Sequence, residues 1–431
     1  MLLLGPRCGR IWLIPVLLAA LLGPSCSRPH GERVVIRFWA LGAEGDNVRS
    51  LIPEFERRYP DIRVDLQAIP WTAAHEKLLT SYAGKSMPDV FQLGNTWIPE
   101  FQVLDAIEDL RPWVATSTVV HEESYFPGIW NVNIIDSALL GIPWYVDTRV
   151  LFYRTDLLAQ EGYTRPPGSW QEWLEVSRRI RARAEQEGRE AYAMLLPTNE
   201  WAPLVILGLQ NGSGLLKERD TRGDFSGDAF REAFGYYTRF FHEGLAPVGV
   251  TQVTNVYQGL AEGFFAMYIT GPWNIGEFRR RLPPQMQDRW MTAPLPSPDG
   301  AQQGVSLAGG SSLAMARSCE QKDEVWKLIE YLSEPSVQLA FYQITGDLPA
   351  RVEAWEDSVL RGNVHVRAFY EQLGHVASVP QVPQWEQIAM KVQQYAEVTS
   401  QGTTPIGEIL AQLDLDVDVI LEKRRWLLNE R

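Results

Sequence analysis

The fold is decided by residues 141–153, which read GIPWYVDTRVLFY. Pro143 fixes its own backbone and biases Ile142 away from the helical region, and β-forming residues follow, so we predict an extended strand. The two ends of the stretch differ, because residues 138–141 look like the close of one sheet and residues 150–153 like the opening strand of another. The stretch is therefore a candidate crossover between two lobes.

This crossover presents two aromatic rings and a carboxylate where a crevice between lobes would lie. Trp144 and Tyr145 point to opposite faces of a strand, so only one of them can line a cleft, and we expect that residue to be Tyr145. An acid inside a strand is costly without a partner, which favours a binding role for Asp147. Rings beside a carboxylate suit a ligand rich in hydroxyl groups.

Length and charge narrow the class of protein. A chain of 431 residues is too long for one typical core, so two lobes are the natural expectation. The composition is globular, with 45% hydrophobic residues, and the 16 tryptophans exceed what a core needs. A formal net charge of -13 argues against nucleic acid as a partner.

The first residues predict export. Residues 1–25 have the arginines, the apolar run and the small residues before the cleavage site that are typical of a signal peptide. The apolar run is too short to span a membrane comfortably. Cys26 follows directly, as in bacterial lipoprotein signals, so we expect it to be the lipidated first residue of the mature chain. Gly23 stands where those signals usually have leucine, which leaves ordinary secretion as the alternative.

Strand and helix patterns alternate after a polar tether, which predicts an α/β lobe with a largely parallel sheet. The expected strands are residues 34–40, 62–66 and 88–93. Ligands of such sheets meet the loops at the carboxyl ends of the strands, where Glu44 and Asn95 fall.

The second half adds further candidates. Trp273 follows a buried strand through Gly271 and Pro272, in an expected loop, and Trp201 lies in the loop after a shorter strand. Trp385 is a third tryptophan to consider. Each of these rings could instead belong to the core.

Residues 305–315 predict a second crossover. Within it Gly309 and Gly310 could form a turn whose bare amides donate to ligand hydroxyls, although a plain turn would also explain them.

Five motifs in this order resemble the extracellular solute-binding proteins of bacterial carbohydrate importers, the family that includes maltose- and trehalose-binding proteins. The motifs are Pro88-Asp89-Val90, Gly141-Ile142-Pro143 with Asp147-Thr148 and Leu151-Phe152-Tyr153, Gly271-Pro272-Trp273, Gly309-Gly310-Ser311, and Leu348-Pro349-Ala350-Arg351. The resemblance covers essentially all of the mature chain.

The resemblance implies a two-lobed periplasmic-binding-protein fold of class α/β. Each lobe would have a mainly parallel sheet flanked by helices, and crossover strands would act as a hinge that closes on a sugar. We expect residues 33–144 and 308–352 to form lobe 1, and residues 145–307 and 353–431 to form lobe 2.

The resemblance also implies roles for single residues. Trp273 matches a tryptophan that stacks on a sugar ring, and Tyr145 and Asp147 match the aromatic residue and the carboxylate of the hinge strand. Arg351 matches an arginine that reaches sugar hydroxyls, although it could also be a surface charge. Glu44 stands where an acid of the first loop often binds, and Asn95 departs from the family's frequent aspartate.

We therefore expect a binding protein that captures an oligosaccharide, most simply a disaccharide, and delivers it to the permease of an ABC importer. We expect no cofactor and no metal, since no histidines are paired at metal-ligand spacing and neither a nucleophile elbow nor a phosphate loop occurs. Residues 414–418 begin like a calcium loop, but the required glycine and glutamate are missing, so we expect a helix face.

Two alternatives stay open. A binder of the same fold could take a polyol or glycerol phosphate, although Glu44 and Asp147 would repel a phosphate. A secreted glycoside hydrolase is the alternative of another class, because its chemistry requires two carboxylates, for which the same two residues could be mistaken.

Overall fold

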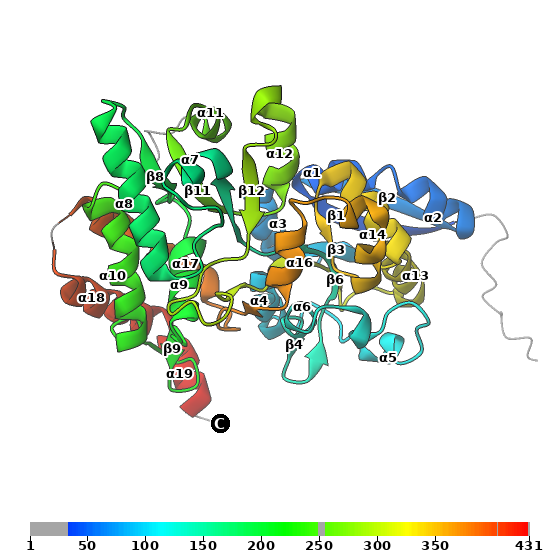
Figure 1. The fold of residues 1–431 in the computed structure, drawn as a ribbon. Coiled ribbons are helices and arrows are strands. Elements are labelled where there is room, and N and C mark those ends of the chain that lie inside the picture. The colour runs from blue at the N-terminus through cyan, green and yellow to red at the C-terminus, as the bar shows by residue number, and fades with distance from the viewer. Residues whose placement is uncertain (1–32, 249–254, 403, 430–431) are drawn as a thin grey trace, which may run out of the picture.

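The computed structural model describes residues 33–248, 255–402 and 404–429, which form two lobes that lie side by side (Figure 1). The first lobe contains a six-stranded sheet of order β15-β6-β14-β3-β1-β2, and the second a four-stranded sheet of order β12-β7-β11-β8. The strands of the first sheet are β1 (Val34–Leu41), β2 (Ile62–Ile69), β3 (Val90–Gly94), β6 (Ile142–Asp147), β14 (Gly309–Met315) and β15 (Leu348–Pro349). Those of the second are β7 (Val150–Arg154), β8 (Tyr192–Leu195), β11 (Phe265–Thr270) and β12 (Trp290–Ala293).

Helices flank both sheets, as expected for an α/β protein. Around the first sheet lie α1 (Gly42–Val48), α2 (Ile52–Arg58), α3 (Trp71–Ala83), α4 (Ile98–Val103), α5 (Arg111–Val114), α6 (Pro127–Asn131), α13 (Lys322–Leu332), α14 (Pro335–Thr345) and α15 (Ser358–Arg361). Around the second lie α7 (Thr155–Gln160), α8 (Trp170–Gln186), α9 (Ala202–Gln210), α10 (Asp228–His242), α11 (Val256–Glu262), α12 (Trp273–Arg281), α16 (Arg367–Leu373), α17 (Trp385–Gln401), α18 (Ile406–Ile420) and α19 (Glu422–Asn429).

Both sheets are mixed, which corrects the expectation of mainly parallel sheets. β1 is parallel to β2 and β3, and β11 is parallel to β8. The other pairings of the two sheets are antiparallel. The reason is the connection between the lobes: the chain leaves the first lobe on β6 and returns on β14, so these neighbours must run in opposite directions.

The crossover predicted at residues 141–153 is confirmed. β6 belongs to the first sheet and β7 to the second, so the chain passes between the lobes at Thr148 and Arg149. The second predicted crossover is also present, as β13 (Ser306–Leu307) followed by β14. Ser306 ties the two crossings together, because its Oγ accepts from the Arg149 N–H at 3.1 Å and donates to the Arg149 carbonyl at 2.8 Å.

A third segment joins these crossings. β16 (Val376–Ala377) pairs with β13 in parallel, so three segments lie side by side where the lobes meet. Three small ribbons complete the strands: β13 with β16, β4 (Ile134–Ile135) with β5 (Ala138–Leu139), and β9 (Leu216–Lys217) with β10 (Arg222–Gly223).

Three local expectations were wrong. The residues after β1 form α1 rather than a loop, with Gly42 at φ 52° making the turn into the helix. Trp273 is the first residue of α12 rather than part of a loop. Gly309 and Gly310 open β14 rather than forming a turn, since they pair with Asp147 and Val146.

The expectation of a helix at residues 414–418 is confirmed, since they lie within α18. Ser169 caps α8 by accepting from the N–H of Glu172. On the crossover, Trp144 is fully buried and stacks on Phe341 with ring centroids 4.5 Å apart, so it belongs to the core.

Candidate ligand-binding cleft

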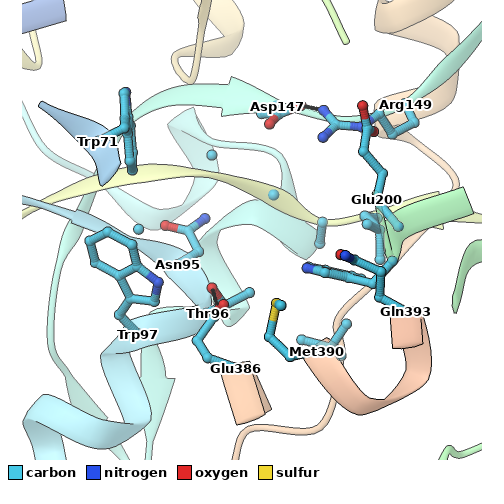
Figure 2. Close-up of a pocket in the computed structure, with 18 of the residues that line it drawn as sticks. Trp71, Asn95, Thr96, Trp97, Asp147, Arg149, Glu200, Glu386, Met390 and Gln393 are labelled. Atoms are coloured by element: carbon cyan, nitrogen blue, oxygen red, sulfur yellow. Dashed lines mark hydrogen bonds and ion pairs between the residues drawn. The ribbon is translucent and has the colours of Figure 1, made fainter. Parts of the chain in front are cut away.

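A cavity of about 460 Å³ lies beside the three crossing segments and is lined from both lobes (Figure 2). Its volume falls within the range of small-molecule sites. The lining residues are Trp71, Gly94, Asn95, Thr96, Trp97, Asp147, Arg149, Asn199, Glu200, Trp201, Ala202, Leu307, Ala308, Gly309, Gly310, Val379, Glu386, Met390 and Gln393. The cavity therefore includes five of the predicted ligand-binding residues: Asn95, Asp147, Trp201, Gly309 and Gly310.

Asn95 offers a hydrogen-bond donor to the cavity. It follows β3 directly, its side chain faces the cavity in Figure 2, and it is 8% exposed. Its Oδ1 accepts from the Ser312 hydroxyl at 3.0 Å, which sets the orientation of the amide. The Nδ2 group is buried and has no partner in the described part of the chain, so it is a donor ready for a ligand oxygen.

Asp147 lies at the end of β6 and pairs with Arg149 at 2.6 Å. Desolvation in the cleft raises the pKa of Asp147, and the guanidinium of Arg149 opposes this shift. The pKa of Glu200, across the cavity, is also raised by burial. The cavity therefore combines carboxylates that accept from hydroxyls with one cation.

The two glycines let β6 and β14 approach each other beneath the cavity. A Cβ on Gly309 would lie 2.4 Å from the Asp147 carbonyl oxygen, and one on Gly310 would lie 2.3 Å from that of Tyr145. Gly310 also has φ 136°, a conformation that L side chains rarely adopt. Packing alone thus requires glycine at both positions, and their backbone is part of the cavity surface.

Tyr145 and Glu44 lie behind the cavity wall rather than on it. The Tyr145 hydroxyl donates to Glu44 Oε1 at 3.2 Å and accepts from Gln92 Nε2 at 3.0 Å. Glu44 Oε2 also accepts from Trp71 Nε1 at 3.3 Å. Burial raises the pKa of both Glu44 and Tyr145. In this conformation the pair supports the Trp71 ring from outside the cavity.

Sequence reasoning missed much of the wall. Trp71 and Trp97 form an edge-to-face pair with centroids 5.8 Å apart in the first lobe. Trp201 lines the cavity from the second lobe and packs edge-on against Trp385, which is fully buried and belongs to the core. Three aromatic rings therefore line the cavity.

One face of α17 supplies another part of the wall that sequence reasoning missed, namely Glu386, Met390 and Gln393. The Thr96 hydroxyl donates to Glu386 Oε1 at 2.5 Å, across a sequence separation of 290 residues. This hydrogen bond joins the two lobes at the cavity.

Arg351 lies outside the cavity, which corrects the expectation that it reaches the ligand. It is 5% exposed, and its guanidinium donates to the carbonyls of Val119 at 2.7 Å and Ser333 at 2.9 Å and to the carboxylate of Glu353. A guanidinium with its donors engaged in the first lobe has a structural role.

Trp273 is also outside the cavity lining, although its ring lies close by. The Arg149 guanidinium covers the ring at 4.4 Å from its centroid. Cys26, the predicted lipidation site, lies outside the described residues.

Across residues 33–248, 255–402 and 404–429, no group of three or more His, Cys, Asp or Glu side chains is placed to hold a metal ion. Within these same ranges no helix has both the length and the apolar character needed to cross a bilayer.

Comparison with known proteins adds independent findings. A sequence model of the family described as bacterial extracellular solute-binding protein matches residues 39–339. The solved structure of the sugar-binding protein MalE from the phytopathogen Xanthomonas citri is similar with a TM-score of 0.89 and 45% identity, covering 92% of this chain and 100% of that one. The diacetylchitobiose binding protein DasA of Streptomyces coelicolor is 24% identical over 87% of each chain. An uncharacterized lipoprotein of Streptomyces antibioticus is 26% identical over 82% of this chain and 78% of its own length.

Proposed function

Since the chain belongs to the bacterial extracellular solute-binding protein family, we propose that it captures an oligosaccharide, most simply a disaccharide, in the cavity between its lobes. It would deliver this sugar to the membrane permease of an ABC importer. The observation that carries the proposal is a cavity with three tryptophans, carboxylates and an unpaired amide donor in its lining.

The chemistry of the lining fits a sugar. The C–H face of a pyranose ring buries against an indole, while its hydroxyls exchange hydrogen bonds with acids and amides around the ring. In our proposal Asp147 and Glu200 accept from hydroxyls, Asn95 donates, and the ring of Trp201 packs on the sugar. The backbone at Gly309 and Gly310 forms the base of the site.

The cavity charges favour a neutral ligand over a phosphate. Asp147, Glu200 and Glu386 line it together with one cation, Arg149, which is already paired with Asp147. A phosphate would meet more negative than positive charge, so glycerol phosphate is disfavoured.

The proposal extends to motion and location. Ligand binding would close the two lobes against each other about the crossing segments. The protein would be exported and held at the membrane by lipid on Cys26. Cys26→Ser should then release it from the membrane fraction of a bacterial host, and a wild-type chain that is already unmodified and unanchored would contradict the anchor.

A thermal-shift screen against a sugar panel tests the function. A ligand at about 100 times its dissociation constant should stabilise the protein by about 2.7 kcal/mol. Chromogenic glycosides in parallel distinguish binding from hydrolysis, since sustained turnover would contradict a binding-only role. We expect no turnover by the pair Glu44 and Asp147, because Glu44 is engaged with Tyr145 and Trp71 outside the cavity.

A further inference from the structure

Arg149 separates the cavity from Trp273. The arginine lines the cavity, and its guanidinium lies over the Trp273 ring at 4.4 Å from the centroid. Trp273 is 38% exposed and is the first residue of α12, with its ring folded back over Gly271. The cavity therefore ends at the arginine on this side, and an aromatic surface lies behind it.

Several contacts hold Arg149 in this position. Its Nη1 donates to Asp147 Oδ1 at 2.6 Å, and its side chain is only 16% exposed. Its backbone N–H and carbonyl both bond to the hydroxyl of Ser306, which is fully buried on the second crossing segment. The arginine is therefore a built wall of the cavity rather than a mobile surface side chain.

The guanidinium occupies a place where a sugar ring could lie. A planar cation over an indole and a pyranose on an indole use the same ring face, so the two exclude each other. The Nε of Arg149 is buried and lacks a partner among the described residues, so the guanidinium packs closely on this side.

We propose that Arg149 sets the length of the oligosaccharide that the cleft accepts, by covering Trp273 and closing one end of the site. This inference rests on the proposed function. With the arginine in place, the last sugar ring ends against the guanidinium. Without it, the cavity extends onto the Trp273 ring and gains a subsite for one more sugar.

The test is a calorimetric comparison of oligosaccharides that differ by one ring. Maltose, maltotriose and maltotetraose form one probe series, and cellobiose, cellotriose and cellotetraose a second. The readout is the ratio of the dissociation constants of successive members, because a uniform loss of affinity from unpairing Asp147 cancels in that ratio. In wild type we expect no further increase in affinity with each added sugar ring once the oligosaccharide fills the cavity.

Arg149→Ala should make the next longer member bind about tenfold tighter relative to the shorter one, which corresponds to one additional aromatic stacking contact. Arg149→Ala combined with Trp273→Ala should remove this gain. Arg149→Lys retains the charge beside Asp147 but lacks the planar group, so its gain should be intermediate.

Arg281→Ala is the matched control. Arg281 also pairs with a carboxylate, Glu277 at 2.6 Å, and also covers an aromatic ring, Tyr257 at 4.8 Å, but it lies outside the cavity lining. This variant should leave the ratio unchanged.

The inference is overturned if folded Arg149→Ala and Arg149→Lys both keep the wild-type ratio, or if the gain persists without Trp273. If wild type binds neither series nor any sugar of the panel, the proposed function fails first and this inference fails with it.

Discussion

The floor and the walls of the cavity are built in different ways. The floor consists of Asn95, Asp147, Gly309 and Gly310, which lie at strand ends and are fixed by hydrogen bonds or backbone packing. The walls are side chains from the ends and faces of helices, and several are substantially exposed, such as Trp71 at 38% and Met390 at 57%. The fold itself needs the floor residues, whereas it depends less on exposed wall side chains such as Trp71 and Met390.

This difference predicts that floor substitutions lower stability most. Gly310→Ala should lower the free energy of unfolding by about 3 kcal/mol, because a Cβ would overlap the Tyr145 carbonyl and the positive φ strains any other residue. Chemical denaturation followed by circular dichroism measures this loss.

Gly407→Ala is the control for Gly310→Ala, since its added Cβ would meet no atom within 4 Å in α18. It should be neutral or slightly stabilising. Equal stability of Gly310→Ala and wild type would show that the floor tolerates a side chain and that its glycines are not structural.

Wall substitutions should instead lower affinity. Trp71→Ala should weaken binding of the sugar found in the panel by about thirtyfold, because it removes a ring from the lining, while the melting temperature changes little. Trp273 is the matched comparison, since it has the same 38% exposure and also begins a helix, but it is covered by Arg149.

Trp273→Ala should therefore weaken binding less than about fivefold, which is smaller than the loss expected for a ring in contact with the sugar. Calorimetric titration of Trp71→Ala and Trp273→Ala measures the two losses of affinity. A greater loss for Trp273 than for Trp71 would mean that the arginine moves aside in the complex and that Trp273 is the main stacking ring.

A smaller effect concerns an acid beneath the floor. Asp347 is 8% exposed, directly precedes β15, and has its pKa raised to about 8 by burial, by Glu44 and by Asp147. The folded state thus retains a proton that the unfolded chain releases. This contribution to stability is present below the unfolded pKa and is lost as pH rises through about 8.

Between pH 7 and 8 the free energy of unfolding should fall by about 1 kcal/mol from this group. Asp347→Asn should make the decrease shallower, as measured by denaturation at each pH. Asp46→Asn, at an exposed position of α1, controls for the loss of one negative charge. An unchanged pH dependence in Asp347→Asn would contradict a protonated acid beneath the floor.

The floor could be predicted from the sequence because local chemistry specifies it. Pro143 and the β-forming residues after it specify an extended crossover, and Asn95 and Asp147 follow directly from strand ends. Trp71 was missed because β2 was expected to end at residue 66. The strand continues to Ile69, which places Trp71 at the same sheet edge as Asn95.

The part of the cavity wall that comes from the second lobe was harder to predict from the sequence. Glu386, Met390 and Gln393 are spaced to share one helix face, but nothing local indicates that this face meets residues 290 positions earlier. Arg351 shows the reverse failure. Its motif resembles a ligand-binding motif, but the carbonyls of Val119 and Ser333 accept hydrogen bonds from its guanidinium. These contacts depend on tertiary packing, which a short motif does not encode.

The central claim is that an oligosaccharide binds in the cavity between the lobes. Calorimetric titration of wild type and Trp71→Ala with the sugar panel tests it most directly. The account predicts that at least one oligosaccharide binds wild type at one site per chain and that Trp71→Ala weakens this binding about thirtyfold. Absence of binding by every sugar at millimolar concentration, or binding that is equally tight in the variant, would contradict it.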